Sequence, residues 1–388
     1  MRRNYKRNFN CNFCKSKHSE SILNLGILPI SNNFIEKKKL SKNYPLHFVR
    51  CASCGLYQTK YKIDSKVIFN KKYPYYSSVS QSWLQHCKKY TKDIINKLKL
   101  NKKSFVIEIA SNDGYLLQYF KKKKIPCLGV EPTKSTANIS RKKGIETLNR
   151  FFSSKESERI INKYKKADLI ILKNVLAHVP DIADFVKGLS KLLNEKGIIT
   201  LEFPSLINLI SKSQFDTIYH EHYSYLNLLV VNKILKRFNL NIFDAETLST
   251  HGGSYRVYIS HKNNILNKIT PRYNKLLNFE KKYFKDSKKN NNDFRNKILS
   301  IKLSLRQFLE KNKKKKIVAY GAAAKGNTMI NFALTENHKK IITHLFDANK
   351  KKQGLCFPGT NLMVENPLKI KNIKPDFIII LPWNIKEE

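Results

Sequence analysis

Apolar runs and amphipathic segments alternate through the middle of the chain. Residues 105–110, F-V-I-E-I-A, form an apolar run broken only by Glu108, and a polar turn leads from it into a helix-like segment. Apolar runs recur at 127–130, 168–172 and 197–203, and helix-like segments lie at 134–143 and 182–193. Alternating strands and helices predict a doubly wound parallel sheet, and therefore an α/β fold.

The pattern changes towards the end of this region. Residues 239–248 and 254–261 are predicted as the terminal, antiparallel strands of the central sheet, joined through His251-Gly252-Gly253. Residues 262–312 then carry apolar side chains at helical spacing among many Lys and Asn residues. This spacing predicts a long connecting helix or a helix pair.

A second strand–helix unit begins with I-V-A-Y at 317–320 and continues through the small-residue turn G-A-A-A-K-G-N-T. Further apolar strands end at Phe346-Asp347 and at Leu381. Together they predict a small Rossmann-like sheet. We therefore expect three domains, at residues 1–72, 73–261 and 262–388.

Four cysteines near the N-terminus form two C-x-x-C pairs: Cys11, Cys14, Cys51 and Cys54. Four thiolates at this spacing can close a tetrahedral zinc site. Because four protein ligands leave no open coordination position, the zinc is expected to be structural. The remaining Cys87, Cys127 and Cys356 fit buried thiols in a reducing compartment.

The first strand of the central sheet leads into Ser111-Asn112-Asp113-Gly114, which lacks the G-x-G-x-x-G that makes room for a dinucleotide pyrophosphate. The next strand ends at Glu131, where a carboxylate can accept hydrogen bonds from both ribose hydroxyls. A nucleoside without phosphates fits this edge better, so S-adenosylmethionine (SAM) is the predicted cofactor. The expected cofactor contacts are Glu108, Ala110, Asn112, Gly114, Glu131 and Asn174.

The stretch from Asp216 to Tyr225, D-T-I-Y-H-E-H-Y-S-Y, is the predicted centre of the chemistry. An imidazole titrates near neutral pH and a neighbouring carboxylate can orient it, so this group could shuttle a proton. The zinc-protease motif H-E-x-x-H is excluded, because Ser224 stands where its second histidine belongs. A polar surface loop is the alternative. His178, at the predicted carboxyl edge of the sheet, either points into the ligand crevice or serves packing or a helix cap.

Two further segments have two interpretations each. The cluster Tyr73-Pro74-Tyr75-Tyr76-Ser77-Ser78 either packs in the core or covers a ligand. The turn at 321–328 nearly matches a P-loop, but Asn327 stands where the lysine belongs, which argues against ATP hydrolysis. Its backbone N–H groups and Lys325 could still cradle phosphate, and close packing of small residues is the alternative. The expected substrate contacts are Tyr320, Gly321, Lys325 and Asn327.

Composition adds limits on partners. The 388 residues carry a formal net charge of +45, which favours small anionic ligands such as nucleotide diphosphates. The lysines are spread along the chain without an aromatic-interleaved basic patch, which disfavours nucleic acid. No apolar run approaches about eighteen residues, and the basic N-terminus lacks an apolar signal region. A soluble, cytoplasmic monomer or dimer without a membrane partner is expected.

Several motifs, in this order, resemble those of the nucleotide-sugar C-methyltransferases: C-N-F-C with C-A-S-C, Y-P-Y-Y-S-S, E-I-A-S-N-D-G-Y-L-L, N-V-L-A-H-V-P-D, Y-H-E-H-Y-S-Y, H-G-G-S-Y-R-V-Y and A-Y-G-A-A-A-K-G-N-T. The resemblance covers almost the whole chain. It implies an N-terminal zinc domain, a central class I SAM-dependent methyltransferase domain and a C-terminal Rossmann-like domain. Members of that family methylate C3 of a dTDP-linked 4-keto sugar.

The resemblance also implies roles for single residues. His222 looks like the general base that forms an enolate next to the C4 ketone, with Tyr219, Glu221 and His178 in support and Tyr76 reaching the substrate region. The four cysteines look like zinc ligands. Because the family continues further beyond the L-P-W-N motif than this chain does, we expect the last strand or helix of the C-terminal domain to be short or missing.

Three rival functions remain open at the level of sequence. An O- or N-methyltransferase acting on a sugar nucleotide would need no 4-keto group. An RNA methyltransferase would use the basic surface and the zinc domain, and its affinity would depend steeply on salt. A nucleotide-binding regulatory protein would bind the cofactor without turnover.

Overall fold

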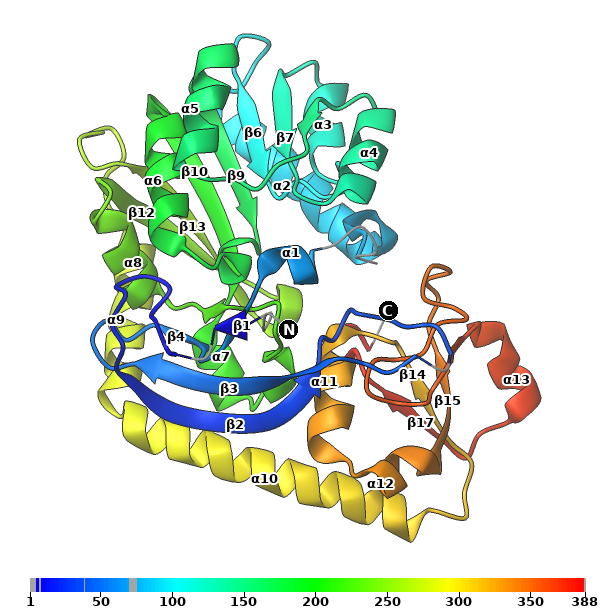
Figure 1. Cartoon of the computed structure of the whole chain (residues 1–388). Helices are drawn as coiled ribbons and strands as arrows, with labels where there is room; N and C mark the ends of the chain where they lie inside the picture. Colours follow the sequence, from blue (N-terminus) through cyan, green and yellow to red (C-terminus); the bar gives the residue numbers. More distant parts are fainter. Residues whose placement is uncertain (1–4, 7, 38, 70–74, 387–388) are drawn as a thin grey trace.

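The computed structural model describes residues 5–6, 8–37, 39–69 and 75–386 (Figure 1). The predicted domain boundary between residues 72 and 73, together with Tyr73 and Pro74 of the tyrosine cluster, lies outside the described residues. Figure 1 places the central sheet at the top and the C-terminal sheet at the lower right. Two long strands, β2 (Ser19–Pro29) and β3 (Asn43–Cys51), lie between them.

In the part of the chain that is described, the central sheet has seven strands in the order β12-β13-β10-β9-β6-β7-β8. Neighbours are parallel except around β13, which is antiparallel to both β10 and β12. The predicted doubly wound sheet with antiparallel terminal strands is therefore confirmed. The strands are β6 (Val106–Ile109), β7 (Cys127–Val130), β8 (Thr147–Leu148), β9 (Ala167–Lys173), β10 (Leu193–Pro204), β12 (Leu240–Leu248) and β13 (Ser254–His261).

Helices cover both faces of this sheet. One hydrophobic cluster joins α2 and α3 to one face, and another joins α5, α6 and α8 to the opposite face. Strand side chains alternate between faces, so Val106 belongs to the first cluster and Ile107 to the second. The carboxyl ends of the parallel strands therefore form the ligand edge. The helices are α2 (Gln81–Leu98), α3 (Leu117–Lys122), α4 (Lys134–Lys142), α5 (Ser154–Lys163), α6 (Ile182–Leu192), α7 (Leu206–Ser211) and α8 (Leu228–Lys236).

The N-terminal sheet has the order β11-β4-β3-β2. β2 and β3 form a long antiparallel hairpin, and β4 (Tyr57–Thr59) pairs with β3. β11 (Ser224–Tyr225) pairs with β4, although it belongs to the central part of the chain. The stretch predicted to carry the chemistry thus completes the N-terminal sheet. β1 (Tyr5–Lys6) and β5 (Lys62–Ile63) form a separate pair, and α1 (Ser65–Ile68) follows.

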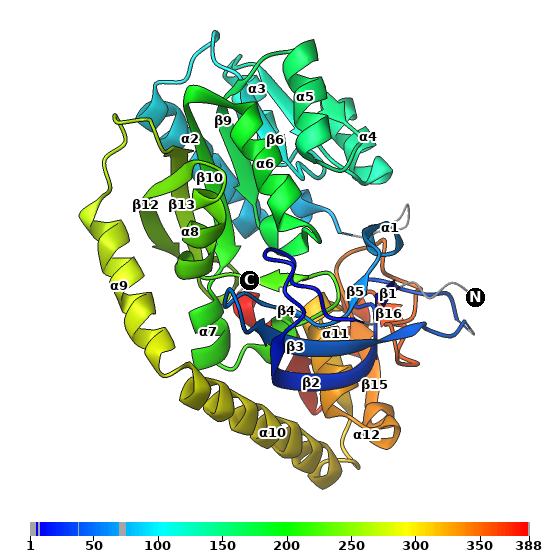
Figure 2. The ribbon, with the colours of Figure 1, turned by 60° about the vertical axis from the view of Figure 1, so that its left-hand side comes forward.

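The connecting segment is a helix pair, α9 (Pro271–Lys285) and α10 (Ser287–Lys311), which is the second of the two predicted alternatives. Figure 2 shows α10 running from the end of α9 past β2 towards the C-terminal sheet. That sheet has the parallel order β16-β15-β14-β17, which confirms the Rossmann-like prediction. Its elements are β14 (Ile317–Tyr320), α11 (Ala324–Ala333), α12 (Glu336–Ile341), β15 (Ile342–Phe346), β16 (Val364–Glu365), α13 (Ile370–Ile373) and β17 (Phe377–Ile380).

Within the described ranges, no helix combines the length and apolar character needed to cross a membrane.

Phe294 of α10 tests how the helix pair holds the N-terminal sheet. Its side chain is 1% exposed, and its ring centroid lies 6.4 Å from that of Phe48 in β3. Phe294→Ala should lower the free energy of unfolding by about 3–5 kcal/mol, because it leaves a cavity in this contact. Leu303→Ala, at a 57% exposed position of the same helix, should cost less than about 0.5 kcal/mol. Chemical denaturation compares the two, and equal losses would contradict this role for Phe294.

Candidate active site

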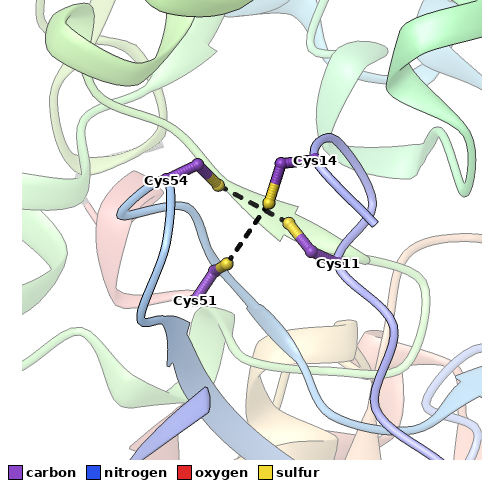
Figure 3. Close-up of side chains that lie close together, drawn as sticks. All are labelled: Cys11, Cys14, Cys51 and Cys54. Atoms are coloured by element: carbon purple, nitrogen blue, oxygen red, sulfur yellow. Dashed lines mark hydrogen bonds between the residues drawn. The ribbon is translucent and has the colours of Figure 1, made fainter. Parts of the chain in front are cut away.

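Four cysteine sulfurs converge beside the N-terminal sheet (Figure 3). The Sγ atoms of Cys11 and Cys54 lie 3.6 Å apart, as do those of Cys14 and Cys51, and all four lie within 4.8 Å of one another. Zn–S bonds of about 2.3 Å in a tetrahedron place the sulfurs about 3.8 Å apart. The arrangement therefore fits one zinc ion with four thiolates, and the distances are too long for disulfides.

The two C-x-x-C pairs lie in matching turns. The residue after each second cysteine, Lys15 or Gly55, has a positive φ, of +63° and +81° respectively. Its amide N–H donates to the carbonyl of the first cysteine of the pair, Cys11 or Cys51. Each turn thus brings the two sulfurs of its pair together, and the sulfurs of the two turns point toward one another (Figure 3).

The loop after β6 has a strained backbone at the ligand edge. Ala110, Asn112 and Gly114 have positive φ values of +59°, +49° and +74°. Such a conformation costs about 1–3 kcal/mol at each residue other than glycine, and it is typical of sites where the backbone approaches a ligand. All three residues were predicted as cofactor contacts.

Two buried carboxylates flank this loop. Glu131 accepts hydrogen bonds from the amides of Asn112 (2.9 Å) and Thr133 (2.8 Å), which orient its carboxylate at the edge where a ribose was predicted. Burial raises the pKa of Glu108 well above its usual value, and the Tyr115 hydroxyl is close enough to offset part of that rise. Neither oxygen of Glu108 has a partner at hydrogen-bond geometry among the described residues. A carboxyl group with this unused hydrogen-bonding capacity fits a cofactor that carries an ammonium group, as SAM does.

Asn174 follows β9 at the same edge. Its φ is +55°, and its amide N–H donates to the carbonyl of Glu202 (2.9 Å). Its side-chain Oδ1 is buried without a partner in the described structure. Asn174 therefore also offers an unused acceptor where the cofactor was predicted.

The end of the tyrosine cluster lies across the loop after β6. The Asn112 side chain donates to the carbonyl of Tyr75 (3.3 Å) and accepts from the amide of Ser77 (3.0 Å). The hydroxyl of Ser78 donates to Asp113. Asn112 therefore uses its side chain to hold this segment and offers its backbone to a ligand. Tyr76 reaches the C-terminal domain, where Lys351 Nζ lies 3.5 Å from its ring centroid.

Two imidazoles lie side by side in the predicted catalytic region. The ring centroids of His178 and His222 are 4.8 Å apart. Nδ1 of His178 lies 2.8 Å from the carbonyl of Glu221, and Nδ1 of His222 lies 2.9 Å from that of Thr217. A carbonyl only accepts, so each Nδ1 carries the proton and each Nε2 keeps its lone pair. Burial lowers the pKa of His178 to about 4 and that of His222 well below its usual value, so both rings are neutral.

The other polar residues of the stretch face different neighbours. Tyr219 lies with its ring centroid 4.0 Å from that of His222. His220 is buried, and its Nε2 donates to the carbonyl of Tyr44 in β3 (3.2 Å). The Glu221 carboxylate accepts from the amide of Asn32 (2.7 Å). The structure therefore brings Tyr219 together with His178 and His222, and it directs His220 and Glu221 towards the N-terminal domain.

The C-terminal domain brings a cation to this region. Lys325 lies near the start of α11, and its Nζ donates to the side chain of Asn384 (3.0 Å) and lies 4.6 Å from the Trp383 ring centroid. Trp383 Nε1 donates to Asp216 (2.6 Å). Burial lowers the pKa of Lys325 to about 8. A cavity of about 260 Å³ lies beside this contact, lined by Lys212, Ser213, Gln214, Phe215, Asp216, Met329 and Trp383.

The other predicted substrate residues are less available. Asn327 is 1% exposed, and its amide donates to the carbonyl of Pro358 (2.8 Å), so it supports a loop of its own domain. Gly321 has a φ of +86° and packs so closely on Pro382 that a side chain would clash there. Tyr320 ends β14 and is half-buried. Lys325 differs from these three residues, because its positive charge also lowers the pKa of His222.

His251 was not among the predicted site residues. It has a φ of +55°, its Nε2 is buried without a partner in the described part of the chain, and its ring centroid lies 5.2 Å from that of Trp83. Burial lowers its pKa to about 4. The signals in the sequence were its place before the two glycines that join the last two strands and its position at the start of the motif H-G-G-S-Y-R-V-Y.

A buried ion cluster at the same edge was also missed. Glu202 of β10 pairs with Lys173, Arg256 and His86, and all but His86 are more than nine-tenths buried. Lys173, Glu202 and Arg256 each place a charge in an otherwise apolar strand. These interruptions were the signal in the sequence that could have revealed the cluster. The cluster fixes the carboxyl ends of β9 and β10 against β13.

Three family models match successive parts of the chain. Residues 11–69 match a "Putative zinc binding domain", residues 83–245 a "Methyltransferase domain" and residues 249–388 a "C-methyltransferase C-terminal domain". The chain is also 26% identical over 383 residues to the C-methyltransferase NovU of Streptomyces niveus, covering 97% of this chain and 90% of that protein.

Solved structures resemble the chain more distantly. The PH0226 protein of Pyrococcus horikoshii OT3 has a TM-score of 0.40 at 13% identity, covering 48% of this chain and 95% of its own. A SAM-dependent methyltransferase of Clostridium acetobutylicum ATCC 824 has a TM-score of 0.38 at 14% identity, covering 46% and 92%. These scores are too low to add to what the strand order establishes.

The strand order, the ligand edge and the family matches define a SAM-dependent methyltransferase with a structural zinc site. The order of the three matches and the likeness to NovU make the chain similar, along its length, to C-methyltransferases that carry a zinc-binding domain before the methyltransferase domain and a C-methyltransferase C-terminal domain after it.

Gly114 tests the cofactor loop. A Cβ at this position would lie 2.6 Å from Ile145 Cδ1 and 2.8 Å from Ser140 Oγ, so Gly114→Ala must shift either the loop or these two buried side chains. We expect SAM to bind at least roughly tenfold more weakly, because the backbone groups of this loop that contact it would move. Gly354→Ala is the matched control, because Gly354 also has a positive φ (+80°) but meets open space. Calorimetric titration with SAM measures both, and equal affinities would place the cofactor elsewhere.

Proposed function

We propose that this protein transfers a methyl group from SAM to C3 of a nucleotide-linked 4-keto deoxysugar, with dTDP as the nucleotide. The observation that supports this most is the pair of neutral imidazoles, His178 and His222, each of which donates through Nδ1 to a backbone carbonyl and therefore keeps the lone pair of Nε2 for accepting a proton. A C–H group must lose its proton before the carbon can attack, whereas an amine already has a lone pair. A half-buried, neutral base therefore suits carbon methylation.

His222 is the proposed base. Its Nε2 takes the C3 proton, which the C4 ketone acidifies, while Nδ1–H stays on the Thr217 carbonyl and keeps the ring oriented. The positive charge that forms on the ring is stabilised by that carbonyl. SAM, when bound, supplies an electrophilic methyl group to the resulting carbon nucleophile.

Tyr219 is the proposed donor to the enolate oxygen at C4. Burial holds its pKa well above 10, so the hydroxyl stays protonated, and its ring lies against His222. His178 is a poorer donor, because its proton is engaged with the Glu221 carbonyl through Nδ1. His178 and Glu221 instead support the position of His222. A donor of this kind typically contributes about a hundredfold or more in rate.

The nucleotide-sugar end is proposed to bind residues 262–388, with residues 1–72 as the zinc domain and 73–261 as the SAM domain. Lys325 and the N-terminal amides of α11 can attract the diphosphate. Tyr76, which contacts Lys351, lies between the SAM loop and the C-terminal domain, where it can reach the substrate.

His222→Asn tests the base. We expect kcat to fall by roughly a hundredfold or more, because Asn cannot accept a proton at neutral pH. His18→Asn, on the exposed surface of the N-terminal domain, should retain activity. Mass spectrometry of 4-keto sugar nucleotides incubated with SAM would detect one added methyl group and deuterium exchange at C3. Near wild-type turnover by His222→Asn would make His178 the base, and methylation of the reduced 4-hydroxy sugar would indicate O-methylation instead.

The dependence of activity on pH should follow the ionisation of His222 and Lys325, whose pKa values are both lowered. Burial lowers the pKa of His222 well below 6.5, so activity should fall only as the pH drops through that lowered value. Lys325, whose pKa is lowered to about 8, loses its charge as the pH rises, so KM for the sugar nucleotide should increase above about pH 8. Lys325→Arg, which stays charged, should remove the alkaline rise. An acid limb at or above pH 6.5 would contradict a buried neutral base.

A further inference from the structure

The stretch that carries His222 is fixed by the N-terminal zinc domain. Ser224 and Tyr225 pair with Gln58 and Tyr57 as β11 of the N-terminal sheet. The amide of Thr59 also donates to the carbonyl of Tyr223 (3.1 Å). The polypeptide therefore leaves the central domain, joins the N-terminal sheet, and returns at the start of α8.

Asn12 connects the zinc turn to this stretch. It lies between two zinc ligands and is 0% exposed. Its side-chain amide donates to the carbonyl of Tyr223 and to Ser224 Oγ, each at 2.9 Å. Its backbone N–H donates to the Gln58 side chain, and its carbonyl accepts from Ile182 at the start of α6 (3.2 Å). One residue of the zinc turn thus contacts β4, β11 and the central domain together.

Asn32 holds the other side of the stretch. It lies in the loop after β2, and its amide donates to the Glu221 carboxylate (2.7 Å). The carbonyl of the same Glu221 accepts from His178 Nδ1 (2.8 Å). Displacing Glu221 would therefore move His178 as well as the neighbouring His222.

We propose that Asn12 and Asn32 are positioning residues for the His178–His222 pair, and that the zinc domain acts in the reaction by holding the catalytic stretch in place. This inference rests on the proposed function. The zinc turn sets the position of the Asn12 side chain, and the hairpin β2–β3 sets that of the Asn32 side chain. Both asparagines act on the imidazoles through other residues of the stretch, Asn12 through Tyr223 and Ser224 and Asn32 through Glu221.

Asn12→Asp and Asn32→Asp test the inference, because Asp has the same shape but no N–H donor, and Asn32→Leu repeats the test without the added negative charge. Asn10→Asp is the matched control, since Asn10 is exposed and lies in the same domain. In the test variants, amide hydrogen exchange of residues 219–225 should become at least about fivefold faster. SAM affinity should stay within about twofold, and kcat should fall roughly 10- to 100-fold with less change in KM.

The pH–rate profile separates positioning from general destabilisation. If the stretch is loosened, His222 becomes exposed to water and its pKa rises, so the acid limb of the pH–rate profile should move up towards pH 6.5. A simple loss of folded protein would instead lower the rate equally at every pH. The groups that face His222 are Tyr219 and Tyr225 of its own stretch, His178, His251 and Lys325. None of them is altered in these variants.

The outcomes are distinct. Wild-type hydrogen exchange and an unmoved acid limb in Asn32→Asp would overturn the inference. Zinc content is measured in each variant, and if Asn12→Asp loses the metal, Asn32→Asp decides, because Asn32 lies outside the zinc turns. If the wild-type protein methylates no 4-keto sugar nucleotide, the proposed function fails, while hydrogen exchange still decides whether the asparagines hold the stretch.

Discussion

The pairing of β11 with β4 is the contact on which the site depends. Two residues cannot form a stable strand alone, so β11 exists because the N-terminal sheet offers it an edge. A single hydrophobic cluster then ties that sheet to the other domains through Phe48 of β3, Phe294 of α10 and Phe332 of α11. The relative position of the domains, and with it the position of His222, is therefore set by packing rather than by the local sequence of the stretch.

Burial, rather than overall charge, controls the electrostatics of the site. The chain carries a net charge of +45, yet exposed charges more than about 10 Å apart are largely screened by physiological salt. Burial can shift a pKa by several units, and it lowers the pKa values of His178, His222 and His251. Lys325 adds to this effect on His222 at short range. The result is neutral imidazoles inside a strongly cationic protein.

Local patterns predicted the elements but not the contacts between them. The apolar runs identified the strands of both α/β sheets, and the C-x-x-C spacing identified the four sulfurs that converge. The pairing of β11 was not predictable, because a two-residue strand has no periodicity and its partner lies far away in the sequence. Asn12 and Asn32 gave no signal for the same reason. Glu131 and Asn112 were found at the ligand edge, but the use of the Asn112 side chain by the tyrosine segment depends on tertiary packing.

The proposed chemistry gives a reason why the protein has an N-terminal sheet in addition to its two α/β domains. The carboxyl edge of the central sheet positions SAM, and a carbon nucleophile must meet the methyl group in line. A base that removes the C3 proton must approach the same carbon without occupying that line, so it cannot come from the loop that holds the cofactor. A stretch anchored to a separate sheet meets this condition, because the pairing with β4 positions His222 independently of the loop after β6. On this argument a structural zinc ion contributes to the rate through the rigidity of the sheet beside which it is held.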